Sequence, residues 1–69
     1  MELRDIEYFA VVAEHRNLGR AANALGLSPT ALSKSLRRLK RSLQAKLVNR
    51  TARGVELTIE GNALLTHVR

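Results

Sequence analysis

A regular leucine spacing constrains the fold of this chain more than any other feature. Four leucines follow one another in steps of four, three and four residues: Leu32, Leu36, Leu39 and Leu43. Steps of this size place side chains on one stripe of an α-helix, which repeats every ~3.6 residues. Bases occupy much of the remaining surface of the same segment. The spacing therefore predicts a helix that turns an apolar stripe toward a core and a basic face toward solvent.

The basic helix lies inside a 41-residue stretch, residues 15–55, that contains no acidic residue. Glu14 precedes the stretch and Glu56 follows it. It contains ten bases, whereas the formal net charge of the whole chain is only +6. Those bases are Arg16, Arg20, Lys34, Arg37, Arg38, Lys40, Arg41, Lys46, Arg50 and Arg53. A long surface without balancing carboxylates indicates an acidic partner, either a nucleic acid or an anionic membrane.

The length of 69 residues allows one small domain, and the absence of cysteine excludes a disulfide framework or a thiolate metal site. The absence of cysteine also fits a reducing cytoplasm. The longest apolar run, Phe9–Ala13, is far below the ~20 residues of a membrane span. The amino terminus is acidic, so it does not resemble a signal peptide.

Local signals divide the first part of the chain into three helices. We expect the first over residues 2–14, with Leu3, Ile6, Phe9, Ala10 and Ala13 on its inner face and its acids near the favourable end of the helix dipole. Asn17 can cap a short second helix over residues 18–25, which Gly26 ends. Ser28 and Pro29 are a helix start, so the third helix spans residues 29–43. Two helices joined by a turn of about three residues predict a helix-turn-helix.

The pattern changes after the third helix. Residues 46–49 and 55–57 read as two short strands, and residues 50–54 read as the turn between them, with Gly54 at its tip. Thr58 can cap a last helix from Ile59 to Arg69. The fold class is therefore mainly α: a winged helix-turn-helix of three helices with a β-hairpin wing and the start of a further helix.

An α-helix fits the major groove of DNA, and recognition helices enter by their amino end. Thr30, Ser33 and Lys34 are therefore the candidates for base contact. Arg37, Arg38 and Arg41 lie farther along and are candidates for phosphate contact. The wing could reach a minor groove through Arg53, and the start of the second helix could hold a phosphate near Arg20.

Simpler interpretations exist for several of these residues. A basic helix face is often only a solvated surface, Ser28 is first a cap, and the stem of Arg50 could merely cover the hairpin. Catalysis has little support, because His15 and His67 lack metal-ligand spacing and no phosphate-cradling glycine loop is present. We expect no enzyme activity, no metal and no cofactor.

Several motifs, taken in order, resemble the amino-terminal DNA-binding domain of LysR-type transcriptional regulators of bacteria. They are Leu3, Tyr8-Phe9, Val12-Ala13-Glu14, Asn17 to Ala22, Leu27-Ser28, Ala31 to Lys34, Leu36 to Leu39, Leu47, Arg50-Thr51, Gly54-Val55, Leu57-Thr58 and Gly61. The resemblance covers the whole chain. It implies that the third helix enters the major groove of duplex DNA, that the wing (residues 50–55) touches the adjacent minor groove, and that the last helix is a dimerising linker.

We expect DNA contacts by Pro29, Thr30, Ser33, Lys34, Arg37, Arg38, Arg41, Arg50, Arg53, Arg20 and Ser28. We expect dimerisation through the apolar side chains of the last helix, Ile59, Ala63, Leu64, Leu65 and Val68. Residues 1–57 would be the winged domain and residues 58–69 the truncated start of the linker helix, with effector binding left to an absent domain.

The chain departs from the family pattern at several positions. Pro29-Thr30 stands where Gln-Pro is frequent, Lys34 replaces a frequent arginine and Lys40 a common glutamate. Gln44 stands for a frequent glycine and Val48 for a frequent phenylalanine.

We therefore expect a sequence-specific binder of double-stranded DNA that regulates transcription as a dimer at the nucleoid in the bacterial cytoplasm, with no membrane partner. A membrane-active basic helix is the first alternative, although the two aromatic residues lie in the acidic first helix. An RNA-binding module is the second, although aromatics spaced for base stacking are missing. An enzyme is a distant third.

Overall fold

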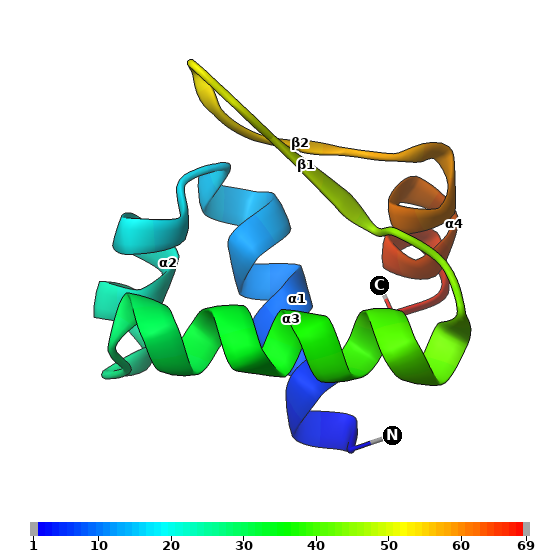
Figure 1. Cartoon of the computed structure of the whole chain (residues 1–69), viewed down its shortest axis with the longest axis horizontal. Helices are drawn as coiled ribbons and strands as arrows, with labels where there is room; N and C mark the ends of the chain where they lie inside the picture. Colours follow the sequence, from blue (N-terminus) through cyan, green and yellow to red (C-terminus); the bar gives the residue numbers. More distant parts are fainter. Residues whose placement is uncertain (1, 69) are drawn as a thin grey trace.

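The computed structural model describes residues 2–68 and confirms the winged helix-turn-helix (Figure 1). Its elements are α1 (Leu3–His15), α2 (Leu18–Leu25), α3 (Pro29–Leu43), β1 (Val48–Thr51), β2 (Gly54–Leu57) and α4 (Ile59–Val68). The two strands pair antiparallel, and α3 crosses in front of α1.

Local signals in the sequence set the ends of the helices as predicted. The Asn17 side chain accepts a hydrogen bond from the Arg20 backbone N–H at 2.9 Å and caps α2. Gly26 ends α2 with a φ of 69°, the left-handed conformation that glycine adopts without steric cost. The Ser28 hydroxyl accepts from the Ala31 N–H at 3.1 Å and caps α3. These caps fix the turn between α2 and α3.

The core lies where α3 crosses α1 and α2. Phe9 packs with Leu39 and Leu47, and Val12 packs with Leu32 and the small side chains of α2. Leucines of the predicted stripe therefore point inward, with Leu32 and Leu39 fully buried. Because Ala21 and Ala22 are small, α2 can approach α1 closely.

The inner face of α1 differs from the prediction at its amino end. Leu3 was expected inside but is 72% exposed, whereas Asp5 is only 1% exposed. The acids of α1 were expected to act through the helix dipole. Asp5 instead binds partners on α3, because its position four residues before Phe9 places it on the buried stripe.

The turn of the hairpin is also shorter than predicted. Thr51 pairs with Gly54, so the loop contains only Ala52 and Arg53, and the predicted turn over residues 50–54 is wrong. Gly54 begins β2 and is not the tip. Its φ is 125°, and a Cβ atom there would overlap the Arg16 carbonyl oxygen. The next residue, Val55, donates its N–H to the same oxygen at 3.0 Å, so this glycine lets the wing dock on the turn between α1 and α2.

The last helix is held closely to the segment before β1. Thr58 caps α4 through its hydroxyl, which accepts from the Gly61 N–H at 3.0 Å, and the Thr58 N–H donates to the Leu47 carbonyl at 3.0 Å. A Cβ atom on Gly61 would overlap that carbonyl. The predicted end of α4 at Arg69 lies outside the described residues. Among the described helices, none is long and apolar enough to span a bilayer.

Candidate nucleic-acid interface

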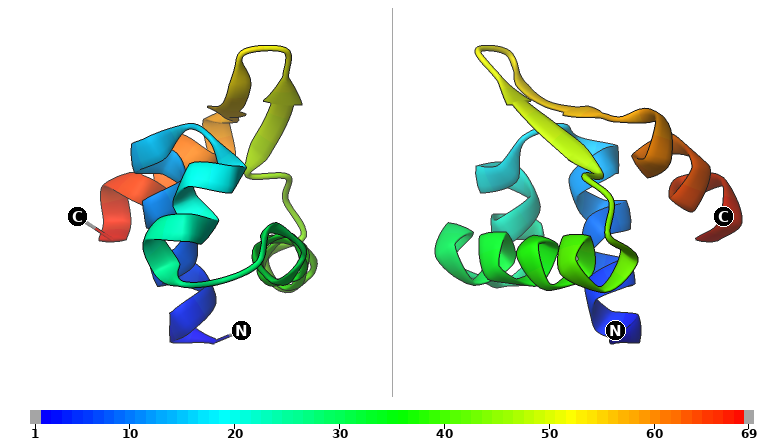
Figure 2. Two further views of the ribbon diagram at one scale, coloured as in Figure 1. Left: turned by 90° about the vertical axis from the view of Figure 1, so that its left-hand side faces the viewer. Right: turned by 45° about the vertical axis from the view of Figure 1, so that its right-hand side comes forward.

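The outward face of α3 carries the predicted contact residues. Thr30, Lys34, Arg37 and Arg41 are all exposed, as is Pro29 at the start of the helix. Viewed along α3, the hairpin stands above the helix on the same side of the molecule, and the carboxyl terminus lies on the opposite side (Figure 2, left). The backbones of α3 and the wing, whose bases are exposed, thus lie on the same side of the molecule.

The amino ends of α2 and α3 add exposed polar groups. Arg20 lies exposed in the first turn of α2, and Ser28 is exposed where α3 begins. The cap role predicted for Ser28 is confirmed, since its hydroxyl oxygen accepts from the Ala31 N–H. Helix starts of this kind favour anions because their first N–H groups point outward and the helix dipole is positive there.

One hydrogen bond connects the wing to α3. Arg50 of β1 donates from Nη2 to the Ser33 hydroxyl oxygen at 2.7 Å. The Ser33 hydroxyl keeps its own proton for a further partner. Arg50 lies in a strand rather than in the turn, and its head group reaches across to α3 rather than only covering the hairpin. Two predicted contact residues are thus brought together.

Arg53 occupies the wing tip. It is exposed in the two-residue loop, and its N–H donates to the Thr51 hydroxyl at 3.2 Å. Figure 1 shows the tip projecting beyond the turn between α1 and α2. Arg53 thus lies in the loop at the wing tip, as the sequence predicted.

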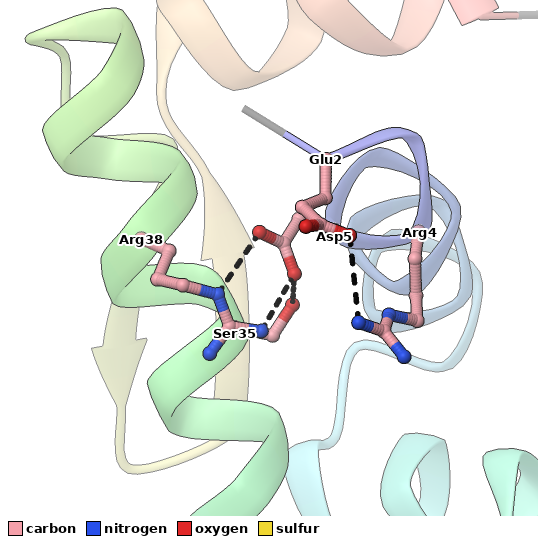
Figure 3. Close-up of polar contacts among 5 residues, drawn as sticks. All are labelled: Glu2, Arg4, Asp5, Ser35 and Arg38. Atoms are coloured by element: carbon pink, nitrogen blue, oxygen red, sulfur yellow. Dashed lines mark hydrogen bonds and ion pairs between the residues drawn. The ribbon is translucent and has the colours of Figure 1, made fainter.

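Arg38 has a partner within the protein that the sequence analysis missed. Its Nε donates to one Asp5 carboxylate oxygen at 3.2 Å and its Nη2 to the other at 2.9 Å (Figure 3). The Ser35 hydroxyl donates to the same carboxylate at 2.6 Å. The Arg38 hydrogen bond, helped by Ser35, lowers the pKa of Asp5 although burial opposes the shift. The contact with Asp5 raises the pKa of Arg38.

The Asp5 contact gives Arg38 a structural role beside the predicted one. Its side chain is still 52% exposed, so the outer edge of the guanidinium faces solvent. A signal for Asp5 was available in the sequence, since it shares the helical stripe of Phe9 and Val12. That stripe does not predict the partners of Asp5 on α3, which are Ser35 and Arg38.

The predicted dimerisation residues fall on two sides of α4. Leu64 and Leu65 are half-buried and pack against the core cluster of Phe9, Leu39 and Leu47. Ile59 is 85% exposed, Val68 is 41% exposed, and Ala63 is exposed. Part of the expected apolar stripe thus closes the core of this domain.

Over residues 2–68 the structure contains no group of three or more histidine, aspartate or glutamate side chains able to hold a metal ion. The polar side chains on the exposed face of α3 are cations and hydroxyls, which suit binding of anions rather than metal ligation.

Residues 3–62 match the model of the bacterial regulatory helix-turn-helix proteins of the lysR family. The regulator BudR of Raoultella terrigena is 49% identical over 63 residues, which are 91% of this chain and 22% of BudR. The regulator TfdT of Cupriavidus pinatubonensis is 44% identical over 69 residues, all of this chain and 30% of TfdT. The chain therefore spans less than a third of the length of these curated relatives, which are regulators rather than enzymes.

Solved structures agree with the sequence relatives. The DNA-binding domain of CbnR in complex with DNA superposes with a TM-score of 0.94 at 38% identity, covering 100% of this chain and 79% of that one. The DNA-binding domain of BenM bound to catB site 1 DNA gives 0.92 at 33% identity, covering 97% and 75%. With the family model matched over nearly the whole chain, this protein belongs to the LysR family of bacterial regulatory helix-turn-helix proteins.

Proposed function

We propose that this chain binds double-stranded DNA in a sequence-specific way and serves transcriptional regulation in bacteria. The observation that carries the proposal is that α3, the start of α2 and the wing all carry exposed bases, and that these bases come from a stretch without a carboxylate. DNA complexes of related domains support it. Such a partner places the protein at the nucleoid in the cytoplasm.

In this proposal α3 lies in the major groove and the wing tip enters the adjacent minor groove. Thr30, Ser33 and Lys34 read base edges near the amino end of α3, beside Pro29. Phosphates are held by Arg20, Ser28, Arg37, Arg41 and Arg50, with the outer edge of Arg38 available for another. Arg53 enters the minor groove.

The proposed domain boundary lies at the Thr58 cap, with residues 1–57 contacting DNA and residues 58–69 starting a helix that pairs two copies. Ile59, Ala63 and Val68 are the exposed apolar side chains for that contact, and Leu64 and Leu65 support them from the core side. A two-fold symmetric DNA site would hold two chains. Effector binding belongs to a domain outside this chain.

A comparison of partners tests the function. Binding should be strongest to a selected duplex and weaker to the same sequence as a single strand, to duplex RNA and to anionic vesicles. With about four to six phosphate contacts for each of two chains, log K should fall against log salt with a slope of roughly −7 to −10. An affinity for duplex DNA that does not change between low and physiological salt would refute the proposal. So would an affinity that is higher for vesicles or for RNA than for duplex DNA.

A further inference from the structure

A hollow runs along one flank of α3, between that helix and the segment that enters β1. Its deeper part has a volume of about 160 Å³ and is lined by Arg37, Lys40, Lys46 and Arg50, with Ser33 at one end. It continues past Arg37, Lys40 and Lys46 into an open part of about 450 Å³ that Arg41 and Gln44 border. We name this continuous hollow the α3–β1 groove.

The cations of the α3–β1 groove form no ion pair with a carboxylate of residues 2–68. Within residues 2–68 the structure has two ion pairs, Arg4 with Glu2 at 3.4 Å and Arg38 with Asp5 at 2.9 Å. Both lie toward α1, on the other flank of α3, as Figure 3 shows. That flank has its own hollow, lined by Arg4, Lys34 and Arg38, but two of its three cations are already paired. The positive potential is therefore concentrated on the flank facing the wing.

The position of the α3–β1 groove fits one element of duplex DNA. A helix about 10–12 Å across nearly fills the ~12 Å major groove, so its flanks face the two phosphate backbones. With α3 in the major groove and the wing tip in the adjacent minor groove, one strand of the DNA must pass between α3 and the wing tip. The hydrogen bond from Arg50 to Ser33 joins the wing to α3 at one end of the α3–β1 groove.

We infer that the α3–β1 groove is a phosphate track that holds this strand, and that Lys40 and Lys46 bind consecutive backbone phosphates there. The inference rests on the proposed function and adds two residues to it. Neither lysine reads bases, since Lys40 projects from the flank of α3 and Lys46 belongs to the loop before β1. The track contributes affinity and salt dependence to every sequence alike.

Single substitutions in the full chain test the track. Lys40→Gln and Lys46→Gln each remove one charge from an exposed position. Arg4→Gln is the matched control, because it removes from α1 one exposed charge that Glu2 already pairs. Each lysine variant should make the salt slope less negative by about 0.9 for every bound chain. Affinity for specific and non-specific duplexes should fall by the same factor. Arg4→Gln should leave the slope near that of the unaltered chain.

Neutral methylphosphonate linkages in the duplex locate the track. Replacing the phosphates one at a time on the strand between the two grooves should weaken binding at one or two positions. At those positions the loss should disappear in a Lys40→Gln/Lys46→Gln variant, because the charged partner is already gone. Circular dichroism of each variant should match the unaltered chain.

The possible results distinguish a failure of the phosphate track from a failure of the proposed function. If the unaltered chain fails to bind duplex DNA, the proposed function is wrong and the track with it. If it binds, but the lysine variants keep its salt slope or change it no more than Arg4→Gln does, only the track is wrong. A methylphosphonate loss that persists in the double variant also overturns the track.

Discussion

The Asp5 carboxylate of α1 receives two hydrogen bonds from the Arg38 guanidinium of α3, from Nε at 3.2 Å and from Nη2 at 2.9 Å. Asp5 is 1% exposed, whereas the Arg38 side chain is 52% exposed. A buried acceptor thus meets a half-exposed donor at the surface edge of the domain. Together with the core, this contact holds α3 on α1, and with it the direction in which the proposed DNA-binding face points.

Asp5→Ala should lower the free energy of unfolding by about 1–3 kcal/mol, because it leaves the buried Ser35 hydroxyl without its acceptor. Thermal or urea denaturation measures the change. Glu7→Ala is the matched control, since Glu7 is an exposed carboxylate on the same helix. Equal stability of the two variants would show that the Asp5 cluster does not hold α3 in place.

Low pH should weaken the contact between Asp5 and Arg38. The pKa of Asp5 is lowered from its ordinary 3.8, chiefly by the Arg38 hydrogen bond. A carboxyl with a lower pKa in the folded state contributes stability that is complete above its ordinary pKa and is lost as the pH falls through the lowered value. Asp5→Asn should therefore be less stable than the unaltered chain near neutral pH, and the difference should shrink toward pH ~2. A melting-temperature difference that stays constant with pH contradicts this assignment.

Gly54→Ala should destabilise the chain by about 1–3 kcal/mol, because alanine is strained at a φ of 125° and its Cβ would overlap the Arg16 carbonyl oxygen. Hydrogen exchange of the Val55 N–H should accelerate as its bond to Arg16 is lost. Gly19→Ala is the control, since Gly19 is helical and its added Cβ would make an ordinary contact of 3.4 Å with the Asn17 side chain. That control should be neutral or slightly stabilising.

Lys34→Ala should relax preference at one base pair in each half-site, at a cost of about 1–3 kcal/mol there. Arg37→Ala should instead weaken all sequences alike and flatten the salt dependence. Arg37 suits this comparison better than Arg38, whose loss would also disturb Asp5. Selection of bound duplexes by each variant measures the preference. Proportional losses of specific and non-specific binding in both variants would remove Lys34 from the base-reading residues.

The free chain should be in a monomer–dimer equilibrium at micromolar concentration. The described part of α4 spans Ile59–Val68, and Leu64 and Leu65 pack against their own core, so little apolar surface remains for a second copy. Association costs several kcal/mol of rigid-body freedom, and two chains of charge +6 repel at low salt. Analytical ultracentrifugation should show the dimer increase on a two-site duplex. A dimer that persists at nanomolar concentration contradicts this expectation.

Features that a few neighbouring residues determine were predictable from the sequence. The caps at Asn17 and Ser28, the left-handed Gly26 and the leucine stripe of α3 each follow from residues within one or two turns of each other. The basic face of α3 was predictable in the same way, because helical spacing places its exposed bases opposite the stripe.

Features that join distant segments were not predictable. Asp5 binds Ser35 and Arg38, which lie thirty or more residues away in the sequence. The helical period of α1 alone does not reveal these two partners. Gly54 has a recognisable turn composition, but its actual constraint is the Arg16 carbonyl on another element. Lys40 and Lys46 become neighbours only when the loop after α3 returns along the helix.

The close contact of Gly61 with Leu47 joins α4 to the segment that leads into the wing. Backbone meets backbone there, and the Thr58 N–H and hydroxyl hold the Leu47 and Lys46 carbonyls of the same segment. No flexible side chain lies between them to absorb a rotation. A change in the angle of α4 would therefore act first on Lys46 and Leu47, the residues that lead into the hairpin.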